Sequence, residues 1–575
     1  MFAPRPWRPD RMTLIAASAA VIASWIALTP SLLPRPAVFQ GLVCALVALV
    51  GYGIGSFIAW VISEWGVEFS ERKLKKAWAV FFVLAAVGTV IVLWRHVRWQ
   101  NRLRDLLGME SLNFGHLTIT VLVSLALFIV FLFIARSIRA GGRFVGRKVS
   151  ALMPPRVAAV SGALIVAMLS FFVFDRVILN KVVEVVDSSF ATINQEFTTE
   201  LPAPTSPHLS AGKGSDISWE DLGRQGRLFI ANAPTPEQIT AFSGRPALQP
   251  VRAYVGVGSD GHIDLEEEAK IAVEELIRTG GFDRAVLNVS TGTGRGWVNE
   301  NSAQALEYMW NGDTATVSMQ YSYLPSWASF LVDGQRAQEA GRHLFDAVYA
   351  HWLTLPQEDR PLLVVSGESL GTFGGEAAFS GAQDLANRVD GALFVGPTGN
   401  NTLWQRFTDD RDAGTSEIAP VYRDGRIIRF SRDGKTWPGG EEWMGTRIGY
   451  LQHDNDPISW WTADLAFHKP DWLREPRGDY VLDQVRWYPI VTMLQTGVDQ
   501  FVANSVPVGQ GHLFGQAPVY AWATILAPEG WSDEQTKALA KVIKSRVRAT
   551  EANAEDAQDS SSGSSGIGSG KSSED

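Results

Sequence analysis

The residue pattern with the clearest chemical meaning is a G-x-S-x-G sequence at positions 367–371, with Ser369 at its centre. It follows an apolar run that begins at Pro361 and precedes the small-residue segment 374–378. This order predicts a buried strand, a sharp turn that carries Ser369, and a helix. The flanking glycines leave room for a strained turn that lifts the serine hydroxyl out of the sheet. Ser369 is therefore a candidate nucleophile, although Gly- and Ser-containing turns also arise by chance.

A serine hydroxyl becomes a good nucleophile when an imidazole takes its proton and a carboxylate fixes the tautomer of that imidazole. In hydrolases with this turn, the chain order is serine, acid, histidine. Three histidines follow Ser369, namely His453, His468 and His512. His512 lies in a glycine-rich loop near the end of the domain, and we predict it as the base. The alternative for His512 is a solvated turn histidine, and His468 is typical of an ordinary surface residue.

The acid is expected just after the strand predicted over 446–452. Asp456, directly before a proline, lies farther past this strand and is the first choice, and Asp454 is the alternative acid. Together with His453 they also resemble a metal cluster, but three ligands within four residues rarely converge on one ion. We therefore expect no bound metal, and we expect no cofactor.

An acyl-transfer site also needs N–H donors for the developing oxyanion. The backbone N–H of Leu370 is one candidate, because it follows the nucleophile. The loop 290–297 follows an earlier predicted strand and offers Thr291 and Gly292 as further donors, while Arg295 is placed to contact an anionic group. The alternating glycines of this loop match neither of the two phosphate-binding fingerprints.

The elements that position these residues alternate between strand and helix. Strands are predicted over 251–257, 284–290, 314–323, 361–368, 392–395 and 446–452, and helices over 265–278, 335–352, from the nucleophile to about 388, and from 532 to about 547. This alternation predicts an α/β fold with a doubly wound, mostly parallel sheet. Active sites of such sheets lie at the carboxyl ends of the strands.

The N-terminal third has a different composition. Residues 1–180 hold 19 Lys and Arg against 7 Asp and Glu, whereas the remainder holds 32 against 53. Five apolar runs, at 12–28, 38–62, 77–94, 117–135 and 157–177, are long enough to cross a bilayer as helices. Buried core helices, and a cleaved signal peptide for the first run, are the alternatives.

Loop charges predict the orientation of these spans. With the N-terminus in the cytoplasm, the inner segments carry thirteen Lys and Arg and the outer segments carry seven. Five spans then predict an integral plasma membrane protein whose later domain lies outside the cytoplasm.

The chain is thus divided into a five-span domain at 1–180, an amphipathic segment and linker at 181–215, and a hydrolase domain at 216–549. Within the last, residues 400–440 are polar and are interpreted as an insertion or lid over the site, or as a plain exposed loop. The Ser/Gly-rich tail 550–575 is predicted to be disordered.

Several of these segments together resemble an actinobacterial family of membrane-anchored α/β-hydrolases. The resemblance rests on residues 29–35 after the first run, the loop 291–297, the segment 366–371, residues 450–453 with Asp456 and its proline, and Gly511 with His512. It implies an α/β-hydrolase fold behind a multi-span region and a triad of Ser369, Asp456 and His512. Asp454 and Asn455 stand where the family has small residues, which leaves Asp454 as a rival acid.

The favoured function is a serine hydrolase or acyltransferase that acts through an acyl-enzyme on an ester. The expected partners are the lipid bilayer and a lipid or acylated cell-envelope substrate at the outer membrane face, with no nucleic acid. One alternative is a non-catalytic membrane scaffold or transport-associated protein with a hydrolase-like binding domain; the scarcity of charges within the spans argues against transport. A peptidase with the same triad is a third possibility.

Overall fold

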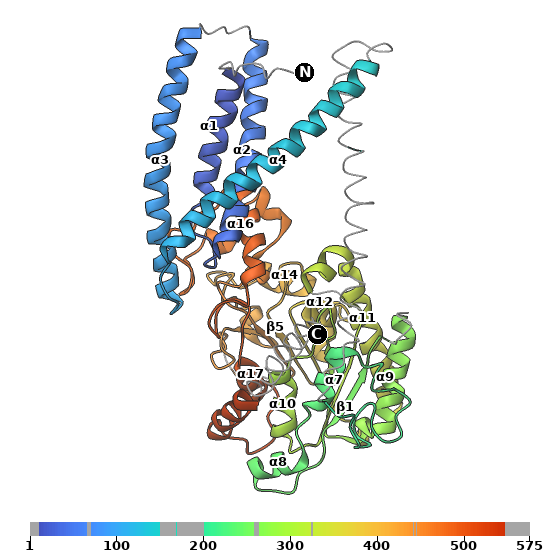
Figure 1. The fold of residues 1–575 in the computed structure, drawn as a ribbon. Helices are drawn as coiled ribbons and strands as arrows, with labels where there is room; N and C mark the ends of the chain where they lie inside the picture. Colours follow the sequence, from blue (N-terminus) through green and yellow to red (C-terminus); the bar gives the residue numbers. More distant parts are fainter. Residues whose placement is uncertain are drawn as a thin grey trace, which may run out of the picture. The chain divides into compact units, whose positions relative to one another are not determined.

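The computed structural model of the protein describes residues 11–65, 71–149, 168, 201–257, 264–323, 326–440, 442–443 and 445–546 (Figure 1). The chain divides into two compact units. The sheet unit comprises Val183–His453 and Phe514–Asp575, and the helical unit comprises Met1–Val182 and Asp454–Leu513. This division differs from the predicted ranges, because residues 454–513 were expected within the hydrolase domain 216–549 and instead group with the N-terminal helices.

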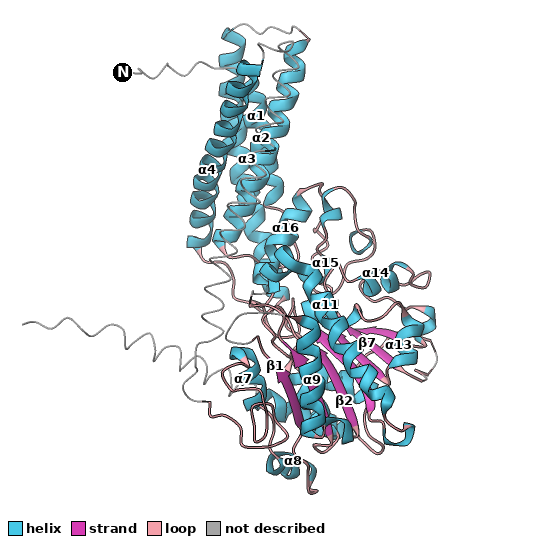
Figure 2. Cartoon of the chain, turned by 90° about the vertical axis from the view of Figure 1, so that its right-hand side faces the viewer, coloured by secondary structure: helices cyan, strands magenta, loops and turns pink. Residues whose placement is uncertain are grey.

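The sheet unit is built on seven parallel strands in the order β1-β3-β2-β4-β5-β7-β6 (Figure 2). Their bounds are β1 Val251–Val255, β2 Val286–Thr291, β3 Thr314–Met319, β4 Leu362–Glu368, β5 Gly391–Val395, β6 Ile428–Ser431 and β7 Arg447–Leu451. Nearly every strand residue is buried, as both faces of a parallel sheet must be. The predicted doubly wound α/β class is confirmed. The edge strand β6 lies inside the segment that was interpreted as an insertion.

Helices cover both faces of this sheet. On one face, α9 (Leu265–Thr279), α11 (Ser326–Thr354) and α12 (Leu370–Glu376) pack together. On the other face, α10 (Glu300–Met309) packs against α17 (Ala517–Ile525), and their apolar side chains share a core with Val286, Val364 and Leu393 of the strands. Further helices are α7 (Gly223–Ala231), α8 (Pro236–Ser243), α13 (Ala382–Arg388), α14 (Thr402–Asp409) and a helix over 533–546.

Local sequence signals set several of these helix ends. Asp264 caps α9 by accepting bonds from the N–H groups of Glu266 and Glu267. Ser532 and Gln535 form the predicted capping box, with the Gln535 N–H donating to the Ser532 hydroxyl over 3.3 Å and the Ser532 N–H donating to the Gln535 side chain over 2.9 Å.

The helical unit begins with four helices, α1 (Arg11–Ala27), α2 (Ala37–Glu64), α3 (Glu71–Leu106) and α4 (Phe114–Val149). Three of the described helices, at Ala37–Glu64, Glu71–Leu106 and Gly115–Gly141, are long and apolar enough to cross a membrane, and Thr13–Ala27 is a shorter apolar helix. The four helices match the first four predicted runs. The fifth run, the segment 181–200 and the tail 550–575 lie outside the described residues.

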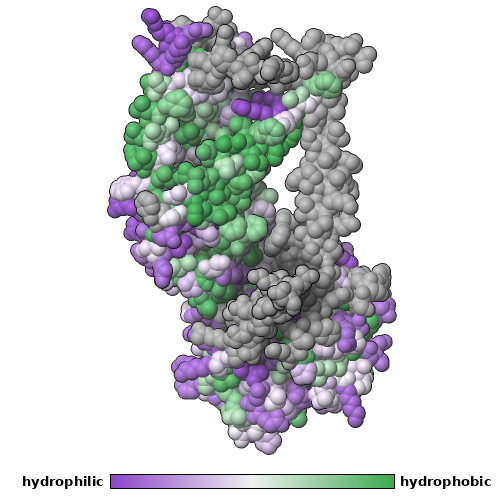
Figure 3. Space-filling view, in the orientation of Figure 1, coloured by the Kyte–Doolittle hydropathy of each residue, from purple (hydrophilic) through white to green (hydrophobic). Residues whose placement is uncertain are grey.

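Apolar side chains gather on the outer surface of α3 and α4 (Figure 3). Large exposed residues of this kind include Phe82, Val90, Leu122 and Phe133. Such a surface is unfavourable in water and suits contact with lipid. Between α1 and α2, a side chain at Gly51 or Gly55 would clash with the backbone of α1, so these glycines allow the close packing that is common between membrane helices.

The segment 454–513 completes the helical unit. It contains α15 (Pro457–Trp460), α16 (Val491–Asp499) and the 3₁₀ turns η5 (Ala463–Ala466), η6 (Asp471–Leu473) and η7 (Gln500–Val502). Val491 and Val498 of α16 share an apolar cluster with Leu28, Val43 and Val47 of the N-terminal region. Figures 1 and 2 both show α16 beside the end of α2.

Candidate active site

Ser369 lies between the end of β4 and the start of α12, as predicted, and its backbone is strained. Its φ of 54° and ψ of −122° are unusual for a residue that has a Cβ atom. A side chain at Gly367 would clash with the backbone of Gly371, and one at Gly371 would clash with the carbonyl of Thr291. The glycines of the pattern are therefore required by close backbone packing, and the turn has the strained strand–turn–helix geometry that the pattern predicts.

Hydrogen bonds from residues that the sequence did not single out hold the Ser369 turn. The Ser369 N–H donates to the carbonyl of Val395 over 2.9 Å. Thr372 donates its hydroxyl to the Ser369 carbonyl over 2.7 Å, and the Asn401 side chain donates to the Thr372 hydroxyl over 2.9 Å. Thr372 and Asn401 are fully buried. The buried side chains of Thr372 and Asn401 thus hold the strained turn through hydrogen bonds.

Glu376, on α12, extends this network. Its carboxylate accepts bonds from the Tyr450 hydroxyl over 2.9 Å and from the N–H groups of Leu403 and Trp404, at the N-terminus of α14, over 3.0 and 3.3 Å. Burial raises the pKa of Glu376 to about 7, against the opposing effect of these hydrogen bonds. The carboxylate connects α12, the helix that follows Ser369, to α14, and it takes up a proton near neutral pH.

The loop 290–297, called the oxyanion loop here because it is predicted to supply oxyanion donors, lies beside the Ser369 turn. Thr291 pairs with Gly367 in the sheet, and the carbonyls of Thr291 and Gly292 lie against Gly371. The Tyr254 hydroxyl donates to the carbonyl of Gly296 over 2.8 Å and so fixes the far side of the loop. The structure therefore brings Thr291 and Gly292 close to the start of α12.

Two further predicted residues are Leu370, next to Ser369, and Arg295, on the loop 290–297. Leu370 is the first residue of α12, and the N–H of a first helical residue has no partner within its own helix. Arg295 lies on the oxyanion loop with its side chain exposed. Partial burial lowers the pKa of the Arg295 guanidinium, although the residue as a whole is exposed. The Asn299 side chain, just beyond the loop, donates to the carboxylate of Glu368 next to Ser369.

Asp456 and His512 meet in the helical unit. His512 Nδ1 lies 2.6 Å from Asp456 Oδ2, and the two side chains are 5% and 0% exposed. Because an ionised carboxylate only accepts hydrogen bonds, Nδ1 carries the ring proton, and Nε2 of the neutral ring is then the proton acceptor. Asp456 also accepts a bond from the Ile458 N–H over 2.9 Å, which holds its carboxylate in place. This arrangement is the one that a general base and its orienting acid require.

Asn455, which stands next to Asp456, clamps the loop that carries His512. It donates to the Gln510 side chain over 3.1 Å and accepts from the Gly511 N–H over 3.0 Å. Asn455 is fully buried. In the sequence, Asn455 stands out only as a departure from the family pattern; its position beside the predicted acid was the available signal.

The rival acid has a different environment. Asp454 Oδ2 accepts a bond from the Tyr480 N–H over 2.9 Å, and its side chain packs on Gly478. Of the two aspartates, Asp456 is the one whose bond to His512 the structure records. His453 stacks on Phe514 with ring centroids 4.1 Å apart, and His468 is exposed and bonds Asp464 over 2.8 Å.

The predicted site residues thus form two groups. Ser369, Leu370, Thr291, Gly292 and Arg295 belong to the sheet unit, and Asp456, Asp454 and His512 belong to the helical unit. The action of Ser369 with His512 stays a prediction. Within the described ranges, no group of three or more His, Cys, Asp or Glu side chains is arranged to hold a metal ion.

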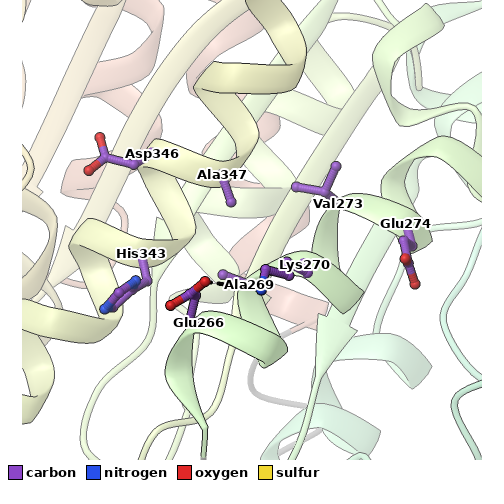
Figure 4. A pocket seen from close by; sticks show the side chains of 8 residues that line it. All are labelled: Glu266, Ala269, Lys270, Val273, Glu274, His343, Asp346 and Ala347. Carbon is purple, nitrogen blue, oxygen red and sulfur yellow. Dashed lines mark ion pairs between the residues drawn. The ribbon is translucent and has the colours of Figure 1, made fainter.

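A groove of about 490 Å³ lies between α9 and α11, and it contains none of the predicted site residues (Figure 4). Lys270 of α9 pairs with Glu266 over 3.0 Å at this groove, where His343 and Asp346 of α11 lie on the opposite side. The Lys270 and Glu266 side chains are largely exposed, so the pair is screened by solvent and contributes little to stability.

The model of an alpha/beta-hydrolase family matches residues 251–539, and the model of that family's N-terminus matches residues 28–234. Comparison with curated proteins and with solved structures found no match. The two family models cover the apolar helices α2, α3 and α4 and the parallel sheet with its Ser369 turn, so the predicted resemblance is confirmed. The chain belongs to the alpha/beta-hydrolase family.

Proposed function

We propose that the protein is a membrane-anchored serine hydrolase or acyltransferase that acts on an ester through an acyl-enzyme. The observation that carries this proposal is the strained conformation of Ser369 at the end of β4. Strain of this kind persists only where the surroundings enforce it, and here the enforcing contacts are buried and polar. The bond between Asp456 and His512 supports the proposal, because it prepares His512 as a base.

In the proposed reaction, His512 Nε2 removes the proton from Ser369 Oγ while that oxygen attacks the ester carbonyl carbon. The oxyanion is stabilised by N–H donors among Leu370, Thr291 and Gly292. The bond to the alcohol then breaks, and the alcohol leaves with the proton from His512. Water, or a hydroxyl of an acceptor molecule, attacks the acyl carbon; its proton passes through His512 to the serine oxygen, which restores the enzyme.

The proposed substrate is a lipid or an acylated component of the cell envelope. The apolar helices would hold the enzyme at a bilayer, where such esters are concentrated. Arg295, exposed on the oxyanion loop, would contact an anionic group of the substrate. The excess of basic residues in the inner loops supports a cytoplasmic N-terminus and a hydrolase domain on the outer side.

A fluorophosphonate probe that cannot cross the bilayer tests the activity and the orientation together. The probe is added to intact cells, to lysate and to detergent extracts that contain the wild-type chain or Ser369→Ala. We expect labelling of the wild type alone, already in intact cells. Equal labelling of Ser369→Ala would exclude Ser369 as the nucleophile, and labelling only after lysis would reverse the orientation. An unlabelled wild type in detergent would favour the non-catalytic scaffold.

A further inference from the structure

A buried ion pair connects the N-terminal region to the segment between Asp456 and His512. Arg35 Nε lies 2.5 Å from Asp499 Oδ1, and the two side chains are 1% and 0% exposed. Arg35 lies between α1 and α2, and Asp499 is the last residue of α16. The two residues are 464 positions apart in the chain and belong to the same compact unit.

Arg35 is held from several sides. It donates to the Gln40 side chain over 2.9 Å and to the Ser31 hydroxyl. From α16, Gln495 donates to the carbonyls of Ala27 and Thr29 over 3.2 and 3.0 Å. One network of buried polar contacts therefore joins two segments: the loop between α1 and α2, and the end of α16.

From Asp499, a short path leads to His512. The turn η7 follows directly, and after it the carbonyl of Ala503 accepts a bond from the His512 N–H over 2.9 Å. Gly511 packs so closely on the same carbonyl that a side chain there would clash with it. Four residues of chain and one hydrogen bond thus separate the ion pair from the backbone of the predicted base.

A buried ion pair is weak evidence for stability, because apolar residues of similar volume often stabilise a core as well. The directional hydrogen bonds of such a pair do, however, fix the relative position of the two residues that it joins. The guanidinium fork allows few orientations, so the pair defines where α16 ends. The position of Ala503, and with it the His512 backbone, depends on that end.

We propose that Arg35 is a positioning residue for the predicted base: through Asp499 it fixes the end of α16 and so the backbone of His512. This inference rests on the proposed function for its catalytic meaning, but the positional link stands on the contacts alone. The connection between the first two apolar helices is then part of the active site's support, and the helices do more than anchor the enzyme.

Two readouts on the full-length protein in detergent test the proposal. The first is hydrogen exchange of the 503–513 backbone, followed by mass spectrometry, which needs no activity. The second is the rate of fluorophosphonate labelling and of nitrophenyl ester hydrolysis, each per folded molecule. The variants are Arg35→Gln, which removes the charge, and Arg35→Lys, which keeps it. If Arg35→Gln fails to fold, Asp499→Asn tests the same ion pair by removing the charge of the other partner.

The matched control is Arg252→Lys. Arg252 is equally buried and pairs with Glu307 over 2.7 Å, but both lie in the sheet unit, away from the 454–513 segment. A general loss of packing would affect this control as much as the Arg35 variants. Arg35 is buried and does not meet substrate, so KM should stay within about twofold while kcat falls.

We expect Arg35→Gln to accelerate exchange at 503–513 and to slow labelling at least tenfold, with Arg35→Lys between it and the wild type. Exchange and labelling like those of the wild type in both Arg35→Gln and Asp499→Asn would overturn the inference, as would equal effects in Arg252→Lys. If the wild type is never labelled but exchange still responds to Arg35→Gln, the positional link holds and the proposed function fails.

Discussion

His512 and Asp456 are joined by a hydrogen bond of 2.6 Å, with both side chains buried, although 55 residues of chain separate them. The intervening segment contains α15 and α16 and belongs to the unit of the N-terminal helices. The predicted acid and base are therefore supported by the part of the protein that is apolar enough to enter a membrane.

Replacement of Asp456 by Asn should lower turnover by a factor on the order of 10³ to 10⁴, because an amide no longer holds the imidazole in the required tautomer. Asp454→Asn is the matched control. It alters a carboxylate two residues away that bonds the Tyr480 N–H, so we expect activity within about tenfold of the wild type. Rates of ester hydrolysis at saturating substrate, measured for both variants, decide whether Asp456 or Asp454 is the acid. A larger loss in Asp454→Asn would make Asp454 the acid.

The Thr372 hydroxyl should support the strained turn. Thr372→Val keeps the shape but removes the bond to the Ser369 carbonyl and leaves the Asn401 side-chain N–H without its acceptor, which costs about 1–3 kcal/mol. We expect labelling of Ser369 to slow by about tenfold and the melting temperature to fall. Thr372→Ser retains the hydroxyl and should label at nearly the wild-type rate. Identical rates for the Val and Ser variants would show that the network does not support the nucleophile.

The sequence predicted much of the sheet and the nucleophile turn. β4 and β5 are apolar runs bounded by turn residues, and their predicted bounds lie within one residue of the observed ones. The strand–turn–helix around Ser369 was predicted because the glycine spacing reflects a steric requirement. By contrast, β6 has only four residues, with Arg429 among them, inside a polar stretch, so no periodicity marked it.

Contacts between residues that are far apart in the chain could not be predicted from the sequence. Arg35 lies in the loop between the first two apolar runs, and nothing local in the sequence pairs it with Asp499. Thr372 and Glu376 look like ordinary polar residues of a short helix until the fold places Asn401 and α14 against them. The grouping of 454–513 with the N-terminal helices likewise arises from tertiary packing, which has no signature in a single sequence.

Asn455 should position the His512 loop through two separate bonds. Asn455→Ala removes both and leaves the buried Gly511 N–H without its acceptor, so we expect ester hydrolysis to fall by about tenfold to a hundredfold. Asn455→Asp keeps an acceptor for Gly511 but loses the donor to Gln510, and we expect an intermediate rate. If the Ala variant hydrolyses the ester as fast as the wild type, the loop is fixed without Asn455.

Glu376 should make stability depend on pH near neutrality. Burial raises its pKa from 4.5 to about 7, so the folded state holds the proton more tightly than the unfolded state. The resulting stabilisation is present in full below about pH 4.5 and is lost as the pH rises through 7; it amounts to roughly 3 kcal/mol. Since Glu376→Gln does not titrate, melting curves in detergent between pH 5 and 8 should show the wild type losing stability relative to this variant as the pH rises.

A second variant, Tyr450→Phe, removes a hydrogen bond that lowers the pKa of Glu376. The loss of stability of the Tyr450→Phe protein should therefore lie at higher pH than that of the wild type. A difference between wild type and Glu376→Gln that is constant with pH would mean that Glu376 does not titrate in this range.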